Sequence, residues 1–141
     1  MPYLEMAGPY RDPEVMCPAC HATLRAFRQR LCCDACEGIL LDPADLATSI
    51  SELTGIDPEI GFVHERPGKR TCPRCALAMT ACRLDVKLMD KRPTLRPALD
   101  RCATHGVWFD AGELAKVFEV LHRAVSSHGY RGGPLNVIGR F

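Results

Sequence analysis

Eight residues stand in four pairs whose spacing suits the binding of metal ions. Two residues separate the members of each pair, so both side chains of one tight turn can point at one ion. Two such pairs complete a tetrahedron and leave no open position for water, which is typical of structural rather than catalytic zinc. The pairs therefore predict two closed zinc sites, one formed by Cys17, Cys20, Cys33 and Cys36, the other by Cys72, Cys75, Cys102 and His105.

Two other uses of these pairs stay open. The C-P-x-C pairs at 17–20 and 72–75 could be redox dithiols, although neither has room for the α/β domain that surrounds such a motif. Four thiolates also bind iron, as in a rubredoxin-like site, so iron stays open at the first site. His105 makes iron less suited to the second site.

The remaining cysteines and histidines have no comparable partner pattern. Cys32 could exchange with Cys33 as a ligand, but Cys33 keeps the two-residue gap to Cys36. Cys82 lies on the apolar face of a predicted strand, so we expect a packed free thiol. The histidines outside the sites are expected to be solvated or ordinary hydrogen-bonding residues: His21, His64, His122 and His128.

Both predicted sites lie in copies of one pattern, residues 17–46 and 72–114. Each copy has two ligand pairs, a Gly-containing apolar stretch, an Asp, then an acidic residue and Leu. Each Asp begins a predicted helix, at about 43–53 and about 111–127, because Asp42 is a good N-cap before Pro43 and Asp110 precedes Glu113 by three residues. The spacers between ligand pairs are expected to form β-hairpins, since residues 82–88 alternate between apolar and polar.

The second copy, from Cys72 to Val117, closely resembles the transcription factor IIB-type zinc ribbon family of bacterial proteins. The resemblance rests on Cys72-Pro73-Arg74-Cys75, on Cys102 and His105, and on the run Gly106-Val107-Trp108-Phe109-Asp110-Ala111-Gly112-Glu113-Leu114. The first copy, Cys17 to Leu46, looks like a degraded version with Leu40 in place of Trp. The family usually has Gly after the second cysteine, where this chain has His21 and Ala76. The resemblance implies a fold and metal ligands, and little about activity.

The predicted fold class is a small, metal-stabilised α+β protein of two tandem zinc ribbons, each a β-hairpin followed by a helix. Trp108 is expected to pack on its own ribbon. The predicted domain organisation is an N-terminal arm at 1–14, zinc ribbon 1 with a short helix at 15–54, a linker at 55–70, zinc ribbon 2 with a C-terminal helix at 71–128, and a tail at 129–141.

Composition and charge narrow the possible functions. The formal net charge of the 141 residues is +1. Seven bound thiolates and two zinc ions would change it to about −2, so the overall charge gives no strong attraction to nucleic acid. No apolar run approaches the length of a membrane span, and residues 1–15 do not resemble a signal peptide, so we expect a cytoplasmic protein without membrane contact. Cysteines in such a chain more often bind metal than form disulfides.

These observations favour a non-enzymatic zinc-binding protein that acts as an interaction or adaptor module on a protein partner or larger assembly. The sequence has no phosphate loop, nucleophile elbow or open metal site that would indicate an enzyme. The alternative is a transcription-related nucleic-acid-binding protein that uses the basic hairpin 83–101, where six basic residues face three acidic ones. Its candidate contacts are Arg83, Lys87, Lys91, Arg92 and Arg96, together with Arg101.

Overall fold

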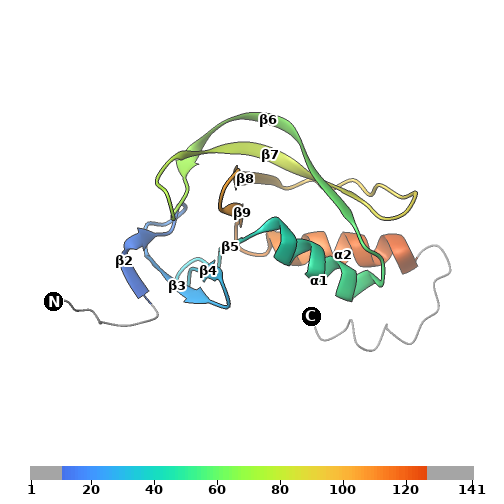
Figure 1. Cartoon of the computed structure of the whole chain (residues 1–141), viewed down its shortest axis with the longest axis horizontal. Helices are drawn as coiled ribbons and strands as arrows, with labels where there is room; N and C mark the ends of the chain where they lie inside the picture. The colour runs from blue at the N-terminus through green and yellow to red at the C-terminus, as the bar shows by residue number, and fades with distance from the viewer. Residues whose placement is uncertain (1–10, 127–141) are drawn as a thin grey trace.

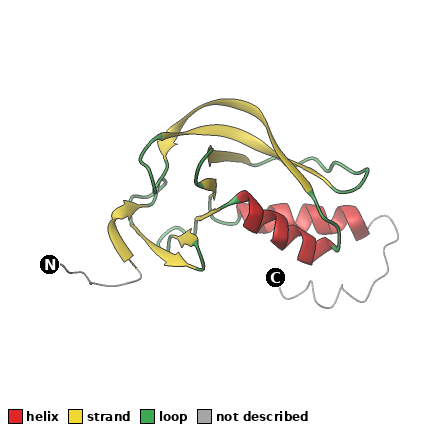
Figure 2. Cartoon of the chain, in the orientation of Figure 1, coloured by secondary structure: helices red, strands yellow, loops and turns green. Residues whose placement is uncertain are grey.

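The computed structural model describes residues 11–126, which form one curled eight-stranded antiparallel sheet and two helices (Figure 1). The strands follow the order β2-β3-β4-β5-β9-β8-β7-β6 across the sheet. Each half of the chain supplies four neighbouring strands and then a helix, and the helices lie together beneath the arch of the longest strands (Figure 2). The elements are β2 (Arg11–Met16), β3 (Thr23–Phe27), β4 (Arg30–Cys32), β5 (Ile39–Leu41), α1 (Pro43–Thr54), β6 (Glu59–Thr71), β7 (Ala78–Lys87), β8 (Ala98–Cys102), β9 (Gly106–Phe109) and α2 (Glu113–Ser126).

The prediction of two tandem zinc ribbons, each a separate hairpin with its own helix, is wrong. Strands β5 and β9 pair with each other in the middle of the sheet, with Leu40 opposite Trp108 and Leu41 opposite Val107. Each of these strands is a short run of consecutive apolar residues, which is stable only when both of its faces are covered. Pairing the two strands removes two exposed sheet edges, and the two clusters of buried side chains cover the faces of both strands. One continuous sheet results.

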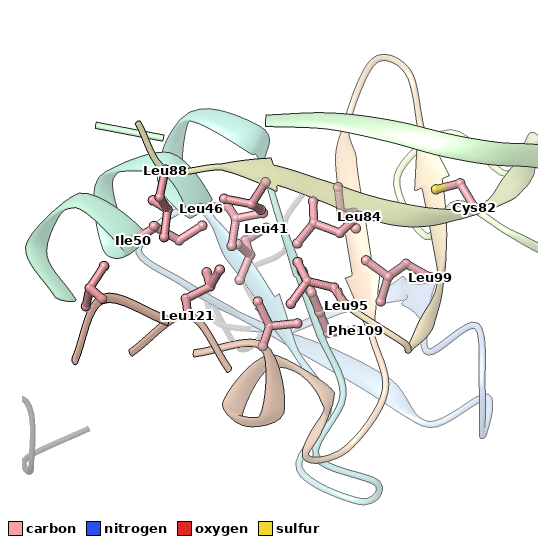
Figure 3. Close-up of a cluster of buried hydrophobic side chains, with 14 residues drawn as sticks. Leu41, Leu46, Ile50, Cys82, Leu84, Leu88, Leu95, Leu99, Phe109 and Leu121 are labelled. Carbon is pink, nitrogen blue, oxygen red and sulfur yellow. The ribbon is translucent and has the colours of Figure 1, made fainter. Parts of the chain in front are cut away.

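The sheet is buried on both faces at this β5–β9 seam. Side chains alternate along a strand, so Leu40 and Trp108 lie on one face and Leu41 and Phe109 on the other. The first face packs into the cluster that contains Cys17, Cys33 and Cys72. The second face packs against the helices in the larger core (Figure 3), whose buried members are Leu41, Leu46, Ile50, Cys82, Leu84, Val86, Leu88, Leu95, Leu99, Val107, Phe109, Val117, Leu121 and Val125.

The predicted helix start at Asp42 is confirmed. Its side chain accepts a hydrogen bond of 2.8 Å from the Asp45 backbone N–H, and Pro43 begins α1. Helix α1 ends at Gly55, whose φ of 76° lies in the left-handed region that glycine tolerates best. Helix α2 is also present, at 113–126 rather than about 111–127, and the Glu113 side chain accepts from the Asp110 N–H at 3.0 Å.

The stretch expected to be a linker, 55–70, contains most of β6, the longest strand. Pro67 and Gly68 are typical of a turn and led to the prediction of a linker. However, β6 is an edge strand of the described sheet, where a proline is tolerated because its missing N–H is not needed for strand pairing. The register of β6 against β7 shifts between Val63 and Arg66 and again between Pro67 and Thr71. Strand β2 likewise begins inside the predicted arm at 1–14.

Residues 1–10 and 127–141, with most of that arm, His128 and the predicted tail, lie outside the described residues. Within 11–126, neither helix has the length and apolar character needed to cross a membrane.

Candidate metal centres

The four ligand pairs occupy four turns that each link one strand to the next. In the first turn, between β2 and β3, the Cys17 N–H donates to the Ala22 carbonyl at 2.7 Å, and the His21 N–H donates to the Cys17 carbonyl at 2.9 Å. The backbone N–H groups of Ala19 and Cys20 point at the Cys17 Sγ at 3.3 and 3.4 Å. These contacts hold the sulfur in place and stabilise its thiolate form.

The first group brings together the four cysteines predicted for the first site. The ligand atoms of Cys17, Cys20, Cys33 and Cys36 all lie within 4.8 Å of one another. The Cys17–Cys36 sulfur distance is 3.6 Å and the Cys20–Cys33 distance is 3.5 Å. A tetrahedron with metal–sulfur bonds of about 2.3 Å has sulfur–sulfur edges of about 3.8 Å. The sulfurs are therefore spaced for one tetrahedral ion.

The second group has the same geometry with one nitrogen ligand. The Cys75 and Cys102 sulfurs are 3.8 Å apart, and the His105 Nδ1 lies 3.6 Å from the sulfurs of Cys72 and Cys102. A tetrahedral ion with bonds of about 2.3 Å to sulfur and about 2.0 Å to nitrogen gives sulfur–nitrogen edges of about 3.5 Å. Nδ1 is thus the histidine atom placed to bind a metal.

Burial and backbone hydrogen bonds divide the thiols into two kinds. Burial raises the pKa of Cys36 to about 12 and the pKa of Cys72 to about 11, and neighbouring thiols add to both shifts. Burial acts in the same direction on Cys33 and Cys102, but nearby backbone N–H groups and side chains outweigh it and lower both pKa values to about 7. A thiol must lose its proton to bind a metal ion, so the lowered pKa values of Cys33 and Cys102 favour metal binding in each group.

The residue that follows each ligand pair adopts a positive φ. The angles are 67° at His21, 68° at Glu37, 63° at Ala76 and 128° at Gly106. This conformation turns the chain sharply away after the second ligand, and it is strained for residues other than glycine. Three of the four turns therefore have a strained backbone at the residue after the ligand pair, namely His21, Glu37 and Ala76.

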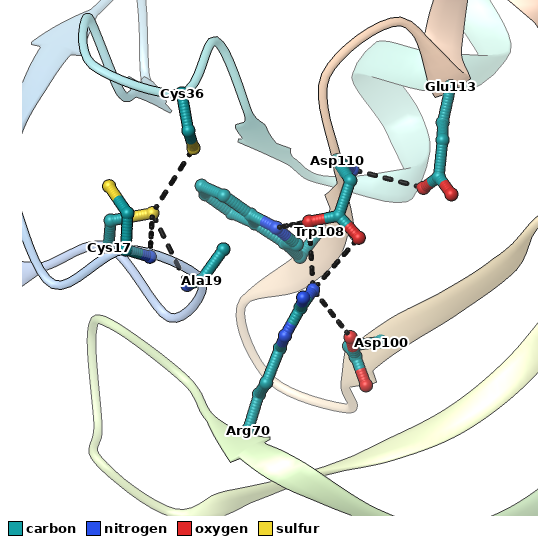
Figure 4. Close-up of polar contacts among 9 residues, drawn as sticks. Cys17, Ala19, Cys36, Arg70, Asp100, Trp108, Asp110 and Glu113 are labelled. Carbon is teal, nitrogen blue, oxygen red and sulfur yellow. Dashed lines mark hydrogen bonds and ion pairs between the residues drawn. The ribbon is translucent and has the colours of Figure 1, made fainter.

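A polar network joins the seam to the edge strand β6 (Figure 4). The Trp108 Nε1 donates to the Asp110 carboxylate at 3.0 Å, and the Arg70 guanidinium donates to both oxygens of that carboxylate at 2.8 and 2.9 Å. Arg70 also reaches Asp100 at 3.4 Å. The Asp110 side chain thus orients Trp108. It does not cap α2, although the sequence predicted that it would. The sequence did not single out Arg70, because it lay in the predicted linker without a motif around it.

Trp108 packs beyond its own half of the chain. Its side chain is 1% exposed and belongs to the cluster that contains Cys17 and Cys72, one ligand from each group. Its ring lies directly over Gly38 on the other half, so the prediction that it packs on its own ribbon covered only part of its contacts. The tryptophan therefore lies between the two candidate metal centres.

The other candidate residues lie apart from the two groups. Cys33, not Cys32, brings its sulfur to the first group, and Cys82 is 1% exposed in the larger core, as expected. In residues 11–126, which hold all nine cysteines, every thiol is free. His21 and His64 are exposed, and both lie outside the two groups.

The basic residues of 83–101 lie on the predicted hairpin, because β7 and β8 pair antiparallel with Arg83 opposite Ala98. They belong to β7, β8 and the connection between them, and β7 and β8 lie within the curled sheet. Arg92 is 3.6 Å from Asp85, and Arg101 is 3.2 Å from Glu65, so part of the positive charge is neutralised within the fold. Arg83 and Arg96 are exposed, whereas Lys87 and Lys91 are half-buried.

No protein family, curated protein or solved structure matches the chain. The resemblance to transcription factor IIB-type zinc ribbons therefore stays a prediction that rests on the motif residues alone.

Proposed function

We propose that this chain is a non-enzymatic zinc-binding protein whose two ions are structural and hold an interaction module in shape. The observation that carries the proposal is the closed geometry of the two groups, in which four protein atoms surround each centre at tetrahedral spacing. A catalytic zinc site keeps one position for water or substrate, and neither group leaves one.

Zinc suits both groups, whereas iron suits only the first. The first group, with four sulfurs, accepts either metal, but the Nδ1 ligand of His105 in the second group favours zinc. The cluster around Trp108 is built partly from ligand cysteines, so the bound ions would support packing as well as local turns. Because the chain has two small cores, the free energy of metal binding would supply much of the folding free energy.

Metal analysis tests this proposal. The purified protein should contain two zinc ions and lack the visible absorption of an iron–sulfur centre. Cys33→Ser should lower the content to one ion, while Cys32→Ser, which alters the neighbouring thiol on β4, should keep two. Fewer than two ions in the unmodified protein, or equal loss in both variants, would contradict the assignment.

Apolar surface supports docking on a protein partner. Leu77 and Met89 are 68% and 71% exposed. A groove of about 500 Å³ lies between α2 and the chain that leads into β8, with Leu95, Pro97 and Val120 among its lining residues. Exposed apolar side chains and apolar grooves are both common at protein interfaces.

Affinity capture from the native host tests the partner. A protein that binds the zinc-loaded chain should be lost from a Leu77→Ser/Met89→Ser variant and from a Val120→Glu variant in the groove, or from one of them. It should be retained by Glu52→Ser, a change at an exposed position on α1. Retention by all three variants would remove these surfaces from the proposal.

Nucleic-acid binding through 83–101 is the second candidate, because Arg83 and Arg96 are exposed and form no ion pair with another described residue. Binding should weaken steeply with salt and should fall in the Arg83→Ala/Arg96→Ala variant.

A further inference from the structure

The β3–β4 hairpin presents an aromatic ring among arginines. Phe27 at the end of β3 is 46% exposed. The Arg28 guanidinium carbon lies 5.3 Å from the centre of its ring, and that of Arg25 lies 5.8 Å away. Arg30 is paired directly opposite Phe27, so its side chain leaves the hairpin on the same face. Two guanidinium groups thus lie near one accessible ring, and a third arginine stands opposite it on the paired strand.

The neighbouring arginines are held at the sides of this hairpin. Arg25 donates two hydrogen bonds to Asp34 at 3.2 and 3.1 Å, and Arg30 donates two to Asp45 at 2.6 and 2.8 Å. Such bidentate pairs fix the plane of each guanidinium. Arg28 forms no ion pair with another residue of 15–126, the stretch whose side chains the structure describes, so within that stretch its charge is not neutralised.

The two residues of the turn at the tip, Arg28 and Gln29, adopt a strained backbone conformation. Arg28 and Gln29 have φ angles of 52° and 68°. A two-residue hairpin turn with both angles positive ordinarily uses Asn-Gly or Gly-Gly, because other residues are strained in this region. Arg74, from the ligand turn between β6 and β7, donates to the Gln29 carbonyl at 3.3 Å and ties the tip to the other half of the protein.

These features suit one class of ligand. An exposed ring flanked by guanidinium planes stacks nucleobases, and a free arginine beside it pairs with phosphate. In a duplex the bases are already stacked and paired, so a single ring at a hairpin tip favours unpaired strands. We propose that the tip formed by Phe27 and Arg28 is a stacking site for single-stranded nucleic acid. This goes beyond the proposed function and uses a different surface from 83–101.

Fluorescence anisotropy on the full, zinc-loaded chain tests the site. The probes are labelled oligothymidylate and oligouridylate of about twelve nucleotides, within the usual site sizes of single-strand binders, and a duplex of the same length. Single strands should bind at low salt and more tightly than the duplex. The comparison of the two strands shows whether DNA or RNA is preferred. Absence of single-strand binding at low salt, or tighter binding of the duplex, would overturn the proposal.

Matched variants assign binding to the tip. Phe27→Leu keeps an apolar side chain but removes the ring, so affinity should fall about 5- to 100-fold, as expected for the loss of one stacked base. Phe27→Trp should restore binding, and Arg28→Gln should weaken it and reduce its salt dependence. Arg83→Ala/Arg96→Ala tests the competing surface at 83–101, and it should cost less affinity than Phe27→Leu if the tip is the binding site.

The variants also separate this site from a general effect on folding or charge. All should retain two zinc ions, which shows that the fold and the metal centres survive. Unchanged affinity in Phe27→Leu, or a larger loss in Arg83→Ala/Arg96→Ala than in Phe27→Leu, would overturn the tip as the binding site. Neither result would change the zinc content or the capture of a protein partner. The proposed function is therefore tested separately from the stacking site.

Discussion

Adding one methyl group at Gly38 should destabilise the protein strongly, because the Trp108 ring already occupies the space. A Cβ on Gly38 would lie 2.2 Å from Cζ2 of Trp108, 2.9 Å from Cη2 and 3.0 Å from Cε2. Carbon atoms in contact normally keep about 3.5–4.0 Å. The ring would have to move by more than about 1 Å to restore that distance.

Trp108 has little freedom to make this movement. It is 1% exposed, and its Nε1 is bonded to Asp110, which is itself bonded to Arg70. Overpacking a buried site costs about 1–3 kcal/mol, and losing a hydrogen bond to a carboxylate costs about 1.5–3 kcal/mol. We therefore expect Gly38→Ala to lower the free energy of unfolding by about 3 kcal/mol, or the melting temperature by about 10 °C.

Gly61→Ala is the matched control. Gly61 lies on the edge strand β6, and no heavy atom stands within 4 Å of a Cβ placed there. The same substitution should be neutral or slightly stabilising, by up to about 1 kcal/mol, because alanine restricts the unfolded chain. Both variants are unfolded in urea with the same zinc supply and followed by circular dichroism.

A double-mutant cycle tests the cause of the loss. Trp108→Leu should be destabilising alone, but Gly38→Ala should cost little in its presence, because the ring that blocks the methyl group is gone. Stability of Gly38→Ala within about 1 kcal/mol of Gly61→Ala, or additive effects in the double variant, would refute the close contact across the seam.

Three further predictions concern strain, charge and metal. Ala76→Gly should stabilise the protein by about 0.5–1 kcal/mol in thermal unfolding, because its φ of 63° is strained for alanine; a loss of stability would contradict this. Burial, with a smaller effect from Asp110, raises the pKa of Asp100 despite the nearby Arg70, so its ionised form costs stability above that pKa. Asp100→Asn should therefore be more stable than the parent at pH 7, and the gain should vanish as the pH falls through the raised pKa. A stability gain of Asp100→Asn that grows toward acid pH would contradict this prediction. Removing the metal with a chelator should abolish cooperative unfolding and shift the emission of Trp108 to the red, whereas unchanged spectra would show that the cluster around it forms without metal.

The ligand turns and helix starts were open to prediction because each is encoded by neighbouring residues. The two-residue gap between Cys17 and Cys20 is enough to define a turn, and Asp42 before Pro43 is enough to begin a helix. The choice of Cys33 over Cys32 followed from the same local geometry, and the structure places the Cys33 sulfur in the first group.

The seam was not open to prediction in this way. Nothing near residue 40 indicates that its partner is residue 108, because strand pairing over such a separation depends on the whole fold. The apolar runs at 39–41 and 107–109 did contain a hint, since each needs cover on both faces. Pro67 led to the wrong prediction of a linker where β6 lies. A proline inside a strand is tolerated at the edge of a sheet, and the sequence does not show which strand is the edge.

The pairing of β5 with β9 also has a consequence for the order of folding. Each candidate metal centre gathers residues that are close in sequence, 17–36 and 72–105, whereas the seam joins segments at 39–41 and 107–109. Closing a short loop is faster than bringing distant segments together, so metal capture should precede seam formation. The slow step would then be the docking of two metal-loaded halves, and until it occurs each half exposes an unpaired apolar strand. Such an edge can pair with another molecule, so exchange of halves between two chains at high concentration is the characteristic misfolding route of this architecture.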